Sequence, residues 1–193
     1  MSGETIHPQS SQSTQRWPFP YPGESEARFD LRTKRYHGDM PEAFHLHRIQ
    51  WQVMGHFTFK SLRPPENIPR AMFKATMRKL CKRHRFYFPK LMWALRSELG
   101  TRKDLCPHFH FLLAALPGQI DLERFCQDCK AAWLALGGGI SVVEPYTRQL
   151  DGAGYLAKRP HTGDDPVGND CELTFSDAAL DYLRRVVQRE RGI

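Results

Sequence analysis

The chain has 193 residues, of which 40% are hydrophobic and 25% are charged. This composition is close to that of an average globular protein and argues against a collagen-like, coiled-coil or wholly disordered chain. A net charge of +7 and a pI near 9.3 point to a polyanionic partner. No stretch approaches the roughly 20 apolar residues of a membrane helix, and the N-terminus lacks the pattern of a secretion signal. We therefore expect a cytoplasmic protein that does not enter a membrane.

The first 45 residues differ in composition from the rest of the chain. They are rich in Ser, Gln, Pro and Gly, and from Trp17 to Pro22 aromatic residues alternate with prolines, which prevent regular structure. We expect an extended arm over residues 1–45 and one folded domain over residues 46–193. The arm is either a loose tether or, through its aromatic side chains, an element that packs on the domain or on a partner.

Residue patterns predict the elements of the first half of this domain. Ile49 to Phe59 is rich in aromatic and β-branched residues and is typical of a strand. The helical spacing of apolar residues from Asn67 to His84 predicts a helix with one buried side. Phe86 to Leu95 and Pro107 to Leu116 are expected to form two further strands, joined as a hairpin.

The second half of the domain contains more helix. Asp121 to Leu136 is expected to be a helix, Ile140 to Val143 a short strand, and a further helical stretch runs through Tyr155 to Pro160. Ser176 is expected to cap a final amphipathic helix. Hairpin-paired strands interrupted by helices predict an α+β fold, with a central, mainly antiparallel sheet flanked by helices.

The positive charge is concentrated in one part of the chain. Residues 60–103 include 13 basic and 2 acidic residues and carry +11, whereas the rest of the chain carries −4. Along the predicted helix, basic residues stand at successive four-residue steps and form a stripe that could follow a DNA phosphate backbone. This basic stripe consists of Arg70, Lys74, Arg78 and Lys82. The alternative is a solvated helix face with no binding role.

The segment from Pro107 to Leu113 is the most informative for chemistry. On a strand, His108 and His110 share one face, and the two imidazoles are close enough to hold one divalent ion. Glu98 lies at the end of the partner strand and could complete a three-ligand site for Mn²⁺ or Mg²⁺ that holds a phosphate. The alternative is two half-exposed histidines beside an ordinary solvated glutamate.

Three segments in this order resemble the motifs of the HUH endonucleases, a family named for a His-hydrophobic-His sequence. Gly55 to Phe59 resembles the first motif, Pro107 to Leu113 the metal-binding second, and Gly154 to Lys158 the third, which supplies a nucleophilic tyrosine. The resemblance covers residues 55–158, over half of the chain. It implies a ferredoxin-like or palm-like antiparallel sheet, with the metal site on its face and the tyrosine on a nearby helix.

The resemblance also implies a reaction. HUH enzymes nick single-stranded DNA or an extruded hairpin in rolling-circle replication, conjugation or transposition, leaving a 5′-phosphotyrosine and a free 3′-hydroxyl. We assign Tyr155 as the nucleophile of a plasmid or phage replication initiator. A phenol is a poor nucleophile until its target phosphate is polarised, and a metal at His108, His110 and Glu98 would do this. Lys158 and Arg159 share the helical face of Tyr155; we expect Lys158 to assist the phenolate and Arg159 to contact DNA.

Departures from the family pattern restrict this assignment. Arg159 occupies the position where two-tyrosine members carry a second nucleophile, so we expect a single one, with Tyr146 as the fallback. Conjugative relaxases of the superfamily generally add a third histidine to the metal site, and we expect no such cluster here. Because the chain has no phosphate-binding loop of the Walker type, a helicase would have to come from the host.

Other functions stay open at this point. One is a tyrosine transposase of the same superfamily that acts on DNA hairpins, and another is a non-catalytic DNA-binding protein that retains the fold and binds through the basic stripe. The five cysteines have irregular spacing and are expected to be reduced thiols. Cys126 and Cys129 lie inside a predicted helix without a second pair at zinc-finger spacing, so we do not expect a zinc site there.

Overall fold

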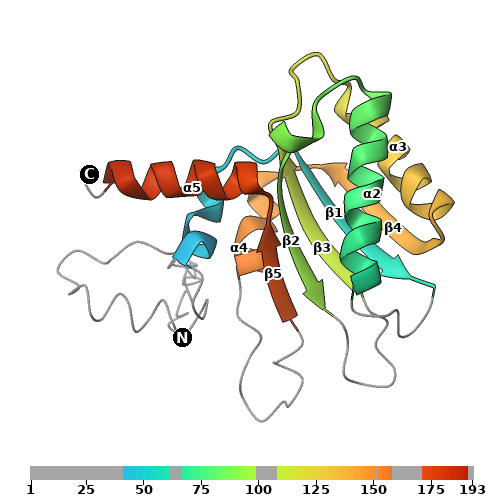
Figure 1. Cartoon of the computed structure of the whole chain (residues 1–193), viewed down its shortest axis with the longest axis horizontal. Coiled ribbons are helices and arrows are strands. Elements are labelled where there is room, and N and C mark those ends of the chain that lie inside the picture. Colours follow the sequence, from blue (N-terminus) through green and yellow to red (C-terminus); the bar gives the residue numbers. More distant parts are fainter. Residues whose placement is uncertain (1–40, 61–66, 99–107, 151, 158–170, 191–193) are drawn as a thin grey trace, which may run out of the picture.

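The computed structural model describes residues 41–60, 67–98, 108–150, 152–157 and 171–190 (Figure 1). Among them, five strands form one antiparallel sheet in the order β4-β1-β3-β2-β5. The strands are β1 (Val53–Phe59), β2 (Met92–Glu98), β3 (His108–Ala114), β4 (Gly138–Pro145) and β5 (Cys171–Phe175). The α-helices are α2 (Asn67–Arg83), α3 (Leu122–Ala135), α4 (Gly152–Ala157) and α5 (Asp177–Glu190). Short 3₁₀ helices are η1 (Pro41–Arg48), η2 (Phe88–Lys90) and η3 (Arg148–Leu150).

The connection of these elements defines the fold. The succession β1-α2-β2-β3-α3-β4 is the split βαβ arrangement of ferredoxin-like folds, and β5 extends the sheet beyond β2. The predicted α+β fold, with a central antiparallel sheet flanked by helices, is confirmed. The predicted cap of the last helix is also confirmed, because the amide of Ala179 donates to Oγ of Ser176 over 3.2 Å.

Two strand predictions were wrong or incomplete. The strand expected from Phe86 begins instead at Met92, because Phe88–Lys90 form a 3₁₀ turn in which the amide of Leu91 donates to the carbonyl of Phe88. Pro89 in this turn has no amide hydrogen to offer a neighbouring strand. The strand Cys171–Phe175 was not predicted, although its alternation of apolar and polar residues is a strand signal.

Each face of the sheet is covered by a different set of helices. On one face, α2 and α3 pack on inward side chains such as Phe57, Phe109 and Phe111, which form a continuous buried cluster. On the other face, α4, α5 and η1 form a second cluster that includes Leu112 and Phe175. Because successive strand residues point to opposite faces, the residues that alternate with these phenylalanines lie on the face of α4 and α5.

The boundary of the predicted arm falls within the first described element. Most of the arm, residues 1–40, lies outside the described residues. Leu46, the first residue of the predicted domain, is buried in the cluster with α4 and α5. None of the described helices has the length and apolar character required to cross a membrane.

Gly55 in β1 is required by the packing of its neighbours. A Cβ atom at this position would overlap the ring of Phe111, the residue of β3 that is paired with Gly55. We expect Gly55→Val to lower the free energy of unfolding by about 1–3 kcal/mol, the usual cost of overpacking a core. A Cβ atom at Gly118 would meet no other atom within 4 Å, so Gly118→Val is the matched control. Equal denaturation midpoints for the two variants would contradict this account.

Candidate metal centre

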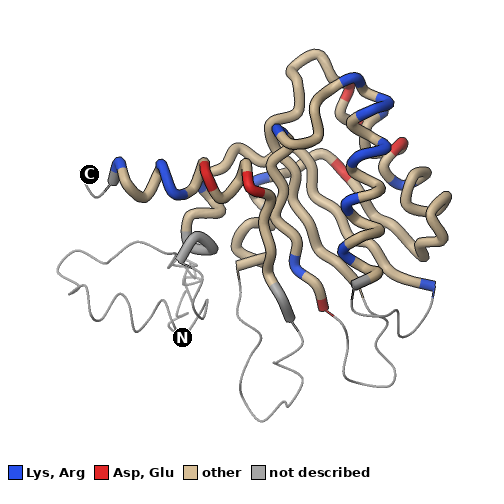
Figure 2. The backbone as a smooth tube through the Cα atoms, viewed as in Figure 1, with Lys and Arg blue, Asp and Glu red and all other residues tan. Residues whose placement is uncertain are grey.

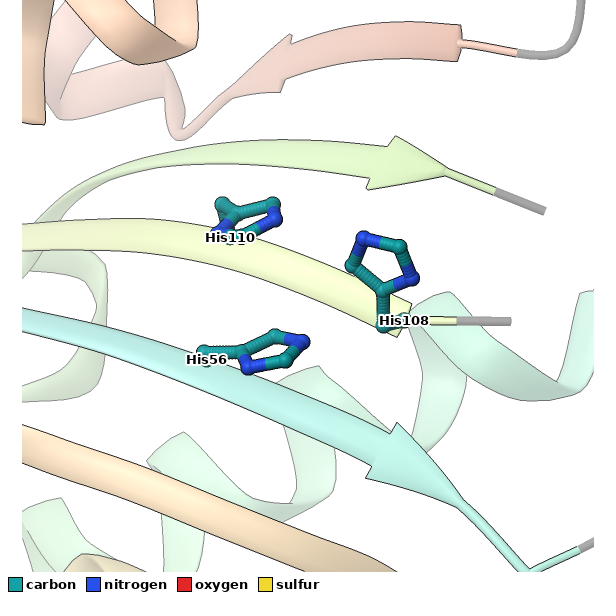
Figure 3. Close-up of side chains that lie close together, drawn as sticks. All are labelled: His56, His108 and His110. Carbon is teal, nitrogen blue, oxygen red and sulfur yellow. The ribbon is translucent and has the colours of Figure 1, made fainter. Parts of the chain in front are cut away.

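Three histidines from two neighbouring strands gather on the face of α4 and α5 (Figure 3). His56 lies on β1 and His108 and His110 lie on β3, and the antiparallel register places His56 directly opposite His110. One ring nitrogen from each of the three lies within 4.8 Å of the others. The rings of His56 and His110 stack with centroids 4.7 Å apart, and the ring of His108 stands edge-on to both at 5.0 Å.

This arrangement meets the requirements of a metal site. Nε2 of His56 is buried and has no hydrogen-bond partner among the described residues. A buried polar atom of this kind is costly unless a ligand or ion satisfies it. Three imidazole nitrogens at this separation can converge on one divalent ion and leave coordination positions for a further ligand. The expectation that no third histidine joins the site was therefore wrong.

The environment keeps two of these imidazoles in the neutral form. Burial lowers the pKa of His110 to about 4, and the neighbouring His56, His108 and Arg96 add to the effect while Glu98 opposes it. Burial and His108 also lower the pKa of His56. Neutral imidazole is the form that binds metals, so both side chains can act as ligands at neutral pH.

Two residues of β2, Arg96 and Glu98, lie beside the histidines. As predicted for the hairpin, Glu98 is paired with His108 in the sheet, and its Oε2 lies 3.1 Å from Nε2 of His108. Nε of Arg96 donates to Oε1 of the same carboxylate over 2.8 Å. The hydrogen bond from His108, followed by the charge of Arg96, holds the pKa of Glu98 at about 2 despite partial burial. The carboxylate is thus ionised and directed at His108; whether it also binds the metal stays a prediction.

We expect Glu98→Gln to weaken metal binding. The substitution keeps the shape of the side chain but removes the charge that holds His108, and loss of such a carboxylate partner typically costs 10–100-fold in metal affinity, about the effect expected here. Titration calorimetry with Mn²⁺ would measure it. Glu144 is an exposed residue of β4 on the same face, and Glu144→Gln should leave the affinity unchanged. A dissociation constant within twofold of the wild-type value for Glu98→Gln would contradict this role.

Tyr155 on α4 reaches the histidine cluster. Its hydroxyl lies 3.3 Å from Nε2 of His110, and the two rings meet edge-on with centroids 4.6 Å apart. The side chain is 40% exposed, so it is accessible to a ligand from solvent. Nη1 of the buried Arg96 donates over 3.4 Å to the carbonyls of Tyr155 and Leu156, and its guanidinium carbon lies 5.8 Å from the centre of the tyrosine ring.

Other predicted residues of the site lie elsewhere or outside the described part of the chain. Lys158 and Arg159 are not among the described residues. The fallback nucleophile Tyr146 is partly buried in the cluster with α4 and packs close to Gly152 at the start of that helix. Tyr182 of α5 packs on the same cluster and donates from its hydroxyl to the carbonyl of Arg48.

The basic stripe lies on the other side of the sheet from the histidines. α2 packs through Phe73 on Phe111, on the face opposite His110. Two of the stripe's cations also contact aromatic rings: Nζ of Lys74 lies 5.8 Å from the ring centre of Trp93, and the guanidinium carbon of Arg78 lies 5.1 Å from that of Phe88. Because the sheet separates the two groups, the stripe does not form part of the metal centre.

Comparison with known proteins identifies no relative. No protein-family model, curated protein or solved structure matches the chain.

Proposed function

We propose that the chain is a metal-dependent endonuclease of the HUH type, which nicks single-stranded DNA and becomes joined to it through a phosphotyrosine. The observation that carries this proposal is the hydroxyl of Tyr155, 3.3 Å from Nε2 of His110 within a cluster of three histidines. A tyrosine with a packing role alone has no need of a candidate metal ligand beside its hydroxyl, whereas a nucleophilic tyrosine must lie close to the metal. The motif order in the sequence and the position of these side chains on one sheet face support the same function.

The residues fit a divalent cofactor. His56, His108 and His110 would hold the ion, and Glu98 would either orient His108 or supply an additional ligand. When bound, a divalent ion supplies a Lewis acid that polarises a phosphate oxygen. Three imidazoles favour a transition metal over Mg²⁺, which prefers oxygen ligands. Mn²⁺ is the first ion to test, because a transition metal that also accepts oxygen ligands suits a site that would hold a phosphate.

Tyr155 would provide the nucleophile for strand cleavage. Its phenolic oxygen forms a bond to the DNA phosphorus and loses its proton, while the bond from phosphorus to the 3′-oxygen breaks and that oxygen takes up a proton. The products are a 5′-phosphotyrosine and a free 3′-hydroxyl. Because the phosphodiester bond energy is retained in the protein linkage, the 3′-hydroxyl of another end can reverse the step and rejoin the strand.

Arg96 would position the nucleophile relative to the metal ligands. Its guanidinium binds Glu98 on one side and the backbone carbonyls of Tyr155 and Leu156 on the other. One buried side chain thus joins α4 to the strand that carries the carboxylate partner of His108. Such fixed geometry matters because small displacements of reacting groups reduce rates strongly.

The proposed substrate is single-stranded or hairpin DNA, at a site where the chain would start rolling-circle replication of a plasmid or phage. The strand would lie on the face of the sheet that carries the histidines, with the exposed edge of Tyr155 directed at its backbone. As the chain has no motif for nucleotide-driven unwinding, a host helicase would extend the opened strand.

A label-transfer assay tests this function. Single-stranded and hairpin oligonucleotides from the neighbouring DNA would be labelled at the 3′ end, because the protein retains the fragment downstream of the nick. We expect labelled protein on a denaturing gel with Mn²⁺, no labelled protein with EDTA, and no transfer from oligonucleotides labelled at the 5′ end. Binding without label transfer, for all substrates and with Mn²⁺ present, would contradict the proposed nickase.

A further inference from the structure

Lys and Arg residues gather along α2, which packs on the sheet face opposite the histidines (Figure 2). α2 contains no acidic residue, and exposed cations cover its C-terminal half and continue into the turn and η2. Together with an exposed tyrosine they form what we term the α2 surface. The α2 surface consists of Arg78, Lys79, Lys82, Arg85, Tyr87 and Lys90.

The turn that ends α2 holds a cation in an unfavourable backbone conformation. The amide of Phe86 donates to the carbonyl of Cys81 over 2.9 Å, and the amide of Arg85 to that of Lys82 over 3.4 Å. These two hydrogen bonds define a Schellman motif, in which the residue at the position of Arg85 is usually glycine because it takes a left-handed conformation. Arg85 has φ = 56°, so the chain keeps a charged side chain where glycine would be free of strain.

η2, which contributes Lys90 to the α2 surface, packs beside α2. The ring of Phe88 lies against the guanidinium of Arg78, which anchors η2 beside α2. Tyr87, next to this anchor, is 66% exposed, so its hydroxyl is accessible to a partner. Lysine, arginine and tyrosine side chains are all common donors to DNA phosphates. The neighbouring Arg83 differs from them, because it pairs with the buried Asp128.

We infer that the α2 surface binds double-helical DNA through its phosphate backbone while a single strand occupies the histidine face. The inference deepens the proposed nickase and rests on it for the identity of the DNA: the duplex would be the paired region that flanks the nicked strand. Rigidly spaced cations on a convex helix suit a duplex backbone. Surfaces for single strands instead combine a charged groove with several stacking aromatics, whereas this surface exposes one.

A pair of double variants tests the surface in EDTA, where no metal-dependent cleavage occurs. Lys79→Gln with Lys82→Gln removes two charges from the α2 surface, and Arg185→Gln with Arg189→Gln removes two exposed charges from α5 as the matched control. We expect the first variant to bind a short blunt-ended duplex at least about tenfold more weakly, and its plot of log K against log salt concentration to be flatter by about 2. Equal losses in the two variants would overturn the inference.

Arg85→Gly separates binding from folding. Glycine suits the backbone of this turn, so we expect a higher thermal midpoint together with a several-fold loss of duplex affinity. Unchanged duplex affinity in this variant and in the Lys79 and Lys82 double variant would overturn the inference. If the substitutions weaken binding of single-stranded DNA and leave duplex binding intact, the surface belongs to the single strand and the assignment to a duplex is wrong.

Competition shows whether there are two surfaces. A saturating single-stranded oligonucleotide should leave a labelled duplex bound, whereas strict displacement would indicate one shared site and contradict the inference. None of these readouts requires cleavage. Absence of label transfer would contradict the nickase proposal. Duplex affinity that is unchanged when the cations of the α2 surface are replaced would contradict the inference, so the two failures are distinguishable.

Discussion

Replacing Tyr155 with phenylalanine is expected to abolish the covalent protein–DNA product. The hydroxyl is the proposed nucleophile, and loss of a nucleophile typically reduces a reaction by at least about 10³-fold. The ring that packs edge-on against His110 and near Arg96 is retained, so the fold should be preserved. Label transfer from a 3′-labelled oligonucleotide measures the product, and binding of the same oligonucleotide in EDTA should change little.

Two controls make this result specific. Tyr146→Phe should transfer label like the wild type, because the Tyr146 side chain packs near Gly152 at the start of α4 and is not the assigned nucleophile. Tyr182→Phe, in α5, should do the same. If Tyr155→Phe transfers label normally while Tyr146→Phe does not, the nucleophile is Tyr146 and the assignment to Tyr155 is wrong.

Replacing His56 with alanine is expected to remove most of the metal affinity. The stacked pair of His56 and His110 would lose one ligand, and the loss in Mn²⁺ affinity should exceed the roughly 10–100-fold that is typical of an outer-shell partner. Label transfer should fall together with the Mn²⁺ affinity and should recover in part at high Mn²⁺ concentration. Titration calorimetry and the gel assay would measure the two effects separately.

The same experiment distinguishes two ligand sets. A centre made of His108, His110 and Glu98 alone predicts nearly unchanged Mn²⁺ affinity in His56→Ala, and that result would contradict the three-histidine centre. His84→Gln is the control, because His84 lies beside Asp128 and Phe125 on the far side of the sheet and should not affect Mn²⁺ binding.

The local geometry of the candidate site could be predicted from the sequence. Strand alternation places His108 and His110 on one face, and a hairpin between neighbouring strands brings Glu98 opposite His108. Both are consequences of short-range backbone geometry. The α+β class followed for the same reason, from the order of strand-like and helix-like segments.

The long-range contacts could not be predicted in this way. His56 lies more than 50 residues before His110, and their pairing depends on the register of β1 against β3, which the intervening α2 and β2 do not reveal. The docking of α4, which brings Tyr155 to His110, is likewise a tertiary contact. One signal was present: a histidine at the middle of a strand of otherwise apolar and small residues is a candidate for any shared site on that sheet face.

The position of the basic stripe follows from a topological rule. Connections between parallel strands of one sheet cross over with a right-handed sense, which places α2 and α3 on the same face of the sheet. The alternating phenylalanines of β1 and β3 fill that face, so their histidine neighbours must lie on the opposite one. The sheet therefore separates the charged helix from the metal centre, although the two are close in sequence.

The measurement that tests the central claim most directly is the mass of the DNA-linked peptide. Wild-type protein would be incubated with Mn²⁺ and a short single-stranded oligonucleotide, digested with a protease and a nuclease, and examined by fragmentation mass spectrometry. The account predicts one nucleotide joined by its 5′-phosphate to the hydroxyl of Tyr155, and no such peptide from His56→Ala at the same Mn²⁺ concentration. A nucleotide on any other residue, or a linkage that forms equally in EDTA, would contradict it.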